Sequence, residues 1–117
     1  MGRLTTHVLD TANGKPGDGM LVTLSRRTGD RYEAIVSVTT NADGRADTPL
    51  LEGGALLPGR YRLVFAAGAY FRRLGVALPE PPFVDEIVID FGVADAALHY
   101  HVPLLVSPWS YSTYRGS

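Results

Sequence analysis

The most informative absence in this sequence of 117 residues is cysteine, of which it contains none. A chain without cysteine can form no disulfide, use no thiolate nucleophile and build no cysteine-ligated zinc site. The sequence also has almost no net charge, because its 11 Lys and Arg residues nearly balance its 12 Asp and Glu residues and give a formal net charge of −1. With neither a basic stripe nor an acidic tail, the charge pattern indicates no nucleic-acid partner.

Long apolar runs are also missing, since no run approaches the roughly 20 residues that a membrane-spanning helix needs. We therefore expect no membrane partner. Met1-Gly2-Arg3 leads directly into a strand pattern without the features of a signal peptide, and the cytoplasm is the expected location. The length and the absence of internal repeats predict a single domain over residues 1–117.

Short segments in which polar and apolar residues alternate make up most of the chain, and turns rich in Gly, Pro, Asn and Asp separate them. The predicted strands are 4–9, 20–25, 31–39, 60–65, 84–91, 98–106 and 111–114, with a short edge strand within 48–58. A turn cluster at 13–19 predicts that the first two strands form a hairpin-like pair, and residues 68–74 predict one short helix that Gly75 ends.

This pattern predicts an all-β fold, an antiparallel β-sandwich of seven to eight strands with one short helix. Many binding modules without catalytic activity have the same pattern of strands and turns. A passive module is therefore an alternative that the pattern alone leaves open.

The histidines are the first candidates for chemistry. His99 and His101 are two residues apart on a predicted strand, so their side chains share a face. With His7 as a third ligand they could form an open zinc site. In the alternative interpretation, His7 or His101 acts as a general base, which requires an imidazole that is neutral near pH 7.

Two arginines and two hydroxyl groups extend this candidate site. Arg45 follows the tight Asp-Gly turn of Asp43 and Gly44, and Arg115 lies close to the end of the sequence. A nearby arginine lowers the pKa of a histidine and can stabilise an oxyanion. Ser112 and Tyr114 share a face of the last predicted strand and could donate hydrogen bonds to a polar ligand. No Gly-x-Ser-x-Gly motif favours a serine nucleophile.

Four separated segments resemble, in order, the motifs of the 5-hydroxyisourate hydrolases, which are transthyretin-related enzymes of urate breakdown. The segments are Leu4-Thr5-Thr6-His7-Val8-Leu9-Asp10, Thr40-Asn41-Ala42-Asp43-Gly44-Arg45, His99-Tyr100-His101-Val102-Pro103-Leu104-Leu105 and Tyr114-Arg115-Gly116-Ser117. Together they span nearly the whole chain. The last segment is the most specific, because the hormone-carrying transthyretins continue with a different tail.

The resemblance implies a transthyretin-like sandwich that assembles into a homotetramer, a dimer of dimers, around a channel that contains the active sites. It implies hydrolysis of a small-molecule substrate, 5-hydroxyisourate, to 2-oxo-4-hydroxy-4-carboxy-5-ureidoimidazoline without a metal or cofactor. The catalytic group that it implies is His7, Arg45 and His101. The substrate-binding residues that it implies are Ser112, Tyr114, Arg115, Gly116 and Ser117. The alternative is a transthyretin-like carrier, although an apolar ligand does not suit a channel lined by cationic groups.

Overall fold

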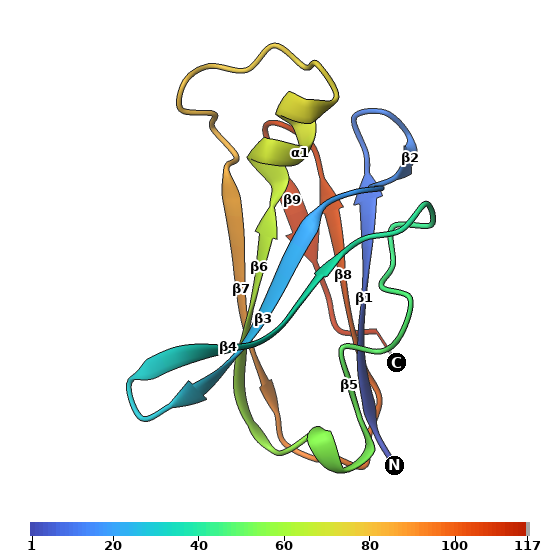
Figure 1. The fold of residues 1–117 in the computed structure, drawn as a ribbon, viewed down its shortest axis with the longest axis vertical. Helices are drawn as coiled ribbons and strands as arrows, with labels where there is room; N and C mark the ends of the chain where they lie inside the picture. Colours follow the sequence, from blue (N-terminus) through green and yellow to red (C-terminus); the bar gives the residue numbers. More distant parts are fainter. Residues whose placement is uncertain (117) are drawn as a thin grey trace.

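Two β-sheets make up most of the structure, a computed structural model that describes residues 1–116 (Figure 1). The strands are β1 (Arg3–Asp10), β2 (Lys15–Pro16), β3 (Leu21–Thr28), β4 (Arg31–Thr39), β5 (Leu51–Glu52), β6 (Gly59–Ala66), β7 (Glu86–Val93), β8 (Tyr100–Val106) and β9 (Tyr111–Thr113). One sheet has the order β2-β1-β8-β9 with β5 also paired to β1, and the other has the order β4-β3-β6-β7. The helices are a 3-10 turn, η1 (Gly53–Ala55), and α1 (Ala67–Arg73). The predicted all-β sandwich with one short helix is confirmed.

Three details differ from the sequence prediction. Within residues 1–116 there are nine strands, because the two-residue strand β2 pairs with the end of β1. The predicted hairpin of the first two long strands is wrong, since β3 crosses to the other sheet and pairs there with β4 and β6. The pairing of β1 with β8 is parallel, whereas the other strand pairs are antiparallel.

Strict alternation on β1 separates the core from the outer face of its sheet. Leu4, Thr6 and Val8 are buried, whereas Thr5 and His7 are half-buried on the opposite face. The buried side chains pack with those of the second sheet in one hydrophobic core. The largest fully buried side chains of that core are Tyr61, Tyr70, Phe65 and Phe71. Burial of each large apolar side chain stabilises the fold by about 1.5–3 kcal/mol. Because a shift by one residue would move the apolar side chains of β1 out of the core, this energy also fixes which side chains remain on the outer face.

A polar cluster joins α1 to the end of β1 inside the fold. Asp10 is buried, and its carboxylate accepts hydrogen bonds from the Tyr70 hydroxyl at 2.7 Å and from the Asn13 amide side chain at 2.7 Å. The Asn13 backbone N–H donates to the same carboxylate at 2.9 Å. Burial opposes ionisation of Asp10, but these hydrogen bonds outweigh it and leave the pKa of Asp10 below its ordinary value. The cluster therefore anchors the helix while Asp10 stays charged.

No helix within residues 1–116 is long and apolar enough to cross a membrane.

We expect the substitution Tyr70→Phe to lower the free energy of unfolding by about 1–3 kcal/mol, because it leaves a buried carboxylate oxygen with one donor fewer. The depressed pKa of Asp10 stabilises the fold above the ordinary aspartate pKa, and this contribution is lost as the pH falls through the lowered value. The deficit of the variant should therefore shrink in acid. Urea unfolding of both proteins at neutral and acidic pH measures it. The control is Tyr32→Phe, at an aromatic ring whose centroid lies 4.0 Å from the Arg62 guanidinium carbon. Equal losses of unfolding free energy in both variants would contradict the role of the cluster.

Candidate functional site

The candidate site lies on the outer face of the sheet that contains β1 and β8. In the parallel register of these strands, Thr5 is opposite His101 and His7 is opposite Pro103. Tyr100 and Val102 are buried on the other face of β8, so the His101 side chain lies outside the core. The register therefore brings His101 next to Thr5 and places His7 two residues farther along the same face.

A rigid turn positions Arg45 beside these strands. The Asn41 side-chain oxygen accepts hydrogen bonds from the backbone N–H groups of Asp43 at 2.9 Å and Arg45 at 3.1 Å. Gly44 has a φ of +77° and lies against the Val8 carbonyl oxygen, where a Cβ would clash. Its own carbonyl accepts a hydrogen bond from the Val8 N–H at 2.8 Å. The turn is thus attached to β1 at a position that only glycine fits well.

His7 is held by the same turn. Its Nε2 lies 2.8 Å from the Asp43 carbonyl oxygen, which can only accept a hydrogen bond, so Nε2 carries the proton. In neutral His7 the lone pair is therefore on Nδ1. A bridge between His7 and Arg45 joins the backbones at this point.

His101 is constrained on two sides. Its Nδ1 lies 2.8 Å from the Thr5 hydroxyl oxygen. Its backbone exchanges two hydrogen bonds with the backbone of Gly116. Gly116 is also close to the ring, because a Cβ at this position would lie only 3.0 Å from Cδ2 of the imidazole. Burial, the positive charge of Arg45 and the proximity of His7 all lower the pKa of His101 below its ordinary value. A neutral imidazole near pH 7 is the form that a general base requires.

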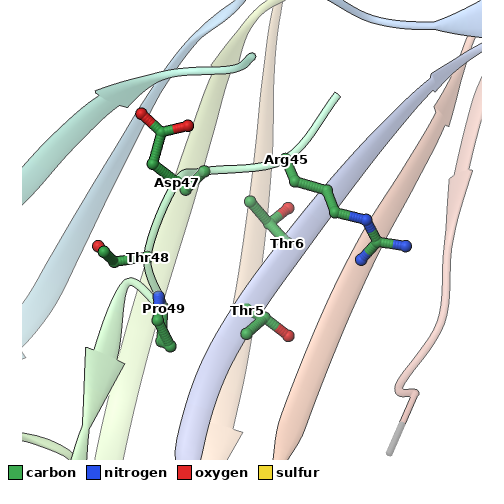
Figure 2. A pocket seen from close by; sticks show the side chains of 7 residues that line it. Thr5, Thr6, Arg45, Asp47, Thr48 and Pro49 are labelled. Atoms are coloured by element: carbon green, nitrogen blue, oxygen red, sulfur yellow. The ribbon is translucent and has the colours of Figure 1, made fainter. Parts of the chain in front are cut away.

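A pocket of about 380 Å³ opens over these groups, lined by Arg3, Thr5, Arg45, His99 and His101. The lining contains basic nitrogen groups and one hydroxyl, but no carboxylate. An adjoining hollow is lined by Thr5, Thr6, Arg45, Ala46, Asp47, Thr48 and Pro49. Figure 2 shows the Arg45 guanidinium pointing away from Asp47. Arg45 is in neither of the two ion pairs found within residues 1–116, which join Arg62 to Asp90 and Arg72 to Glu80. The pocket suits an anion or an oxygen that gains negative charge.

The residues predicted at the C-terminal end divide between two sides of the sheet. Ser112 is opposite Leu105, so it lies on the same face as His101, where it is exposed. Tyr114 follows β9, is exposed, and lines a separate pocket with Tyr100 and Val102. The Arg115 guanidinium lies 4.4 Å from the Tyr100 ring and donates to the His99 carbonyl oxygen at 3.0 Å. Arg115 thus braces the segment before β8. Ser117 lies outside the described residues.

Within one chain, the structure brings together Arg45 and His101 in the pocket, with His7 beside them and Gly116 against His101. Ser112, Tyr114 and Arg115 do not line this pocket. Sequence reasoning assigned no role to Thr5 and Arg3, which do line it. Thr5 could have been found from the sequence, because it lies two residues before His7 on a strand and therefore shares its face.

The zinc alternative requires the three histidines to converge. His7 instead bonds the Asp43 carbonyl, and His99 precedes β8 in an exposed position. Within the described part of the chain, no group of three His, Cys, Asp or Glu side chains is arranged to hold a metal ion.

Comparison with known proteins identifies the family of this site. The model of the HIUase/Transthyretin family matches residues 4–116. The chain belongs to this family. It is 61% identical to a protein of Ralstonia nicotianae named 5-hydroxyisourate hydrolase, over the full length of both chains. The resemblance inferred from the four sequence motifs is thereby confirmed.

Two solved structures of the family show how the same sandwich occurs elsewhere. A structure of (S)-allantoin synthase is 45% identical with a TM-score of 0.94, and the match covers 99% of this chain but 44% of that longer chain. Sea bream transthyretin in complex with thyroxine is 28% identical with a TM-score of 0.87, and the match covers 97% of this chain and 94% of the other. Very similar backbones in the family therefore carry different names, and the function must be argued from the site.

We expect Arg45→Gln to raise the pKa of His101 towards the ordinary histidine value, because the substitution removes a positive charge that disfavours the imidazolium. NMR titration of the His101 ring protons measures the change. Arg31→Gln, an exposed site at the tip of the β3–β4 hairpin, is the matched control and should leave the titration unchanged. An unaltered His101 titration in a folded Arg45→Gln variant would show that Arg45 does not tune this histidine.

Proposed function

We propose that this protein hydrolyses 5-hydroxyisourate to 2-oxo-4-hydroxy-4-carboxy-5-ureidoimidazoline, the reaction implied by its sequence motifs. The observation that carries the proposal is a half-buried histidine of lowered pKa, His101, in a pocket that also holds the Arg45 guanidinium and no carboxylate. The name of the Ralstonia nicotianae relative, 61% identical over both full lengths, supports the same assignment.

In the proposed mechanism, Nε2 of His101 takes a proton from a water molecule. The water oxygen bonds to the ring carbonyl carbon, and the carbonyl oxygen takes the negative charge, which Arg45 stabilises. When the tetrahedral intermediate collapses, the bond between that carbon and its ring nitrogen breaks. The proton held by His101 passes to the departing nitrogen, so the imidazole returns to its neutral form. The six-membered ring is thereby opened to a carboxylic acid, which releases its remaining proton to solvent. The resulting carboxylate lies beside cationic groups that suit it.

We assign His101 as the base because its Nε2 forms no hydrogen bond within residues 1–116 and its pKa is lowered. His7 keeps a place in the catalytic group through its Nδ1 lone pair, which can accept a hydrogen bond from the attacking water or from the substrate. Arg3 and His99 lie at the same pocket and can attract an anionic ligand. Ser112 and Tyr114 are proposed to bind substrate with their hydroxyls, Arg115 to shape the site, and Gly116 and Ser117 to complete it.

We further propose the homotetramer that the motifs imply. Strands β9 and β7 are edge strands whose unpaired backbone groups can join a second copy. Trp109, Tyr111 and Tyr114 are between 50% and 61% exposed, which is typical of side chains that become covered on association. Assembly over the face of β8 and β9 would turn the exposed Ser112 and Tyr114 into walls of a channel. The single domain over residues 1–117 and the cytoplasmic location stay predictions.

A carrier function is the second candidate, because a solved transthyretin of the same family holds thyroxine. The pocket of this chain argues against it. Arginine and histidine side chains over a polar hydroxyl are a poor lining for an apolar ligand. The carrier is also only 28% identical to this chain, whereas the hydrolase relative is 61% identical.

The decisive experiment follows the ultraviolet decay of freshly generated 5-hydroxyisourate with the native protein and with His101→Ala. We expect acceleration by the native protein and a loss of about 10²–10⁴-fold in the variant, because a positioned base is removed. Arg31→Ala, at the exposed tip of the β3–β4 hairpin, is the control and should keep native activity. If the folded native protein leaves the decay unchanged, the hydrolase proposal is wrong, and binding of apolar ligands then tests the carrier.

A further inference from the structure

The hydroxyl of Thr5 makes a contact that neither the sequence motifs nor the mechanism assigns. Thr5 and His101 are directly opposite each other in the β1–β8 register, and the Thr5 Oγ1 lies 2.8 Å from Nδ1 of His101. Thr5 is half-buried and lines the same pocket as His101 and Arg45. The contact thus joins the pocket wall to the nitrogen of His101 that does not face the substrate in the mechanism.

The direction of this hydrogen bond decides which nitrogen of His101 can act as a base. A neutral imidazole has one N–H and one lone pair, and a hydroxyl can donate or accept. If Thr5 donated to Nδ1, the proton of His101 would be on Nε2, and Nε2 could not take a proton from water. If Thr5 accepts from Nδ1–H, the lone pair is on Nε2. The same bond then persists when Nε2 gains its proton, because the imidazolium also carries Nδ1–H.

We propose that Thr5 is a positioning residue, which accepts a hydrogen bond from Nδ1–H of His101 and so keeps the Nε2 lone pair available to the pocket. This inference rests on the proposed function, since it concerns the base of that reaction. Thr5 does not touch the reacting atoms. It acts through the tautomer and the ring orientation of His101.

The surroundings of the ring show why a hydroxyl at this position matters. Gly116 is so close to His101 that a Cβ there would lie 3.0 Å from Cδ2 and 3.1 Å from the His101 Cβ. Gly116 therefore limits where the ring can lie but supplies no side-chain polar atom to distinguish its two flipped orientations. Thr5 does distinguish them, because a flipped ring would present the carbon Cδ2 to the hydroxyl in place of Nδ1.

The next residue on β1 provides a matched control. The hydroxyl of Thr6 donates to the carbonyl oxygen of Val102 at 2.8 Å, so it also joins β1 to β8. Thr6 is buried on the core side and does not line the pocket of Arg45 and His101, although it borders the adjoining hollow. Thr5→Val and Thr6→Val thus remove the same hydroxyl from adjacent positions on the same strand, and only the first touches a histidine.

The kinetic test compares kcat and KM for 5-hydroxyisourate in the native protein, Thr5→Val, Thr5→Ser and Thr6→Val. We expect Thr5→Val to lower kcat by about 10- to 100-fold with little change in KM, as a misplaced catalytic group does. Thr5→Ser keeps the hydroxyl and should stay within about three-fold of native kcat. Thr6→Val should keep native kcat even if its thermal stability falls. Native kcat in Thr5→Val, or an equal loss of kcat in Thr6→Val, would overturn the proposal.

An NMR measurement separates this inference from the proposed function. Two-bond ¹H–¹⁵N correlation spectra of His101 at a pH above its pKa report which ring nitrogen carries the proton. We expect Nδ1 to be protonated in the native protein and Thr5→Ser, and protonation to shift to Nε2 in Thr5→Val. A native spectrum with Nε2 protonated would overturn the role of Thr5. Because this spectrum needs no substrate, it decides that role even if the native protein proves inactive on 5-hydroxyisourate.

Discussion

The parallel pairing of β1 with β8 is the constraint on which the rest of the site depends. It joins two segments almost a hundred residues apart and sets Thr5 opposite His101. Because strand alternation sends every second side chain to the core, this register also decides that His7 and His101 share the outer face. A shift by one residue would bury the histidines and expose Leu4 and Val8. The energy that drives core formation therefore also fixes the positions of the polar groups.

A second constraint is electrostatic. The pocket combines Arg45 with imidazoles and has no carboxylate in its lining. A neighbouring carboxylate would raise the pKa of His101 by favouring the imidazolium, whereas Arg45 lowers it. In the proposed mechanism the same guanidinium keeps the base neutral before the reaction and stabilises the oxyanion during it. The tight turn of Asn41 and Gly44 holds Arg45 close enough to serve both purposes.

Alternation in the sequence predicted most of the fold, because burial on one side of a strand leaves a period-two pattern. It identified β1 and β6, and the helical pattern of residues 68–74 identified α1. It could not show that β1 pairs with β8 rather than with the next long strand, since pairing between distant segments leaves no local pattern. The importance of Thr5 and the different orientation of Arg115 depend on that pairing. The motifs supplied the family, which the residues alone left open.

The measurement that tests this account most directly is the pH dependence of kcat/KM for 5-hydroxyisourate hydrolysis, set beside an NMR titration of His101 in the same protein. Because kcat/KM reports groups of the free enzyme, the account predicts that activity falls in acid with a midpoint at the pKa of His101 itself. That midpoint should lie below the ordinary histidine pKa of about 6.5. Activity that stays constant while His101 gains its proton, or that follows His7 instead, would contradict the assignment of His101 as the base.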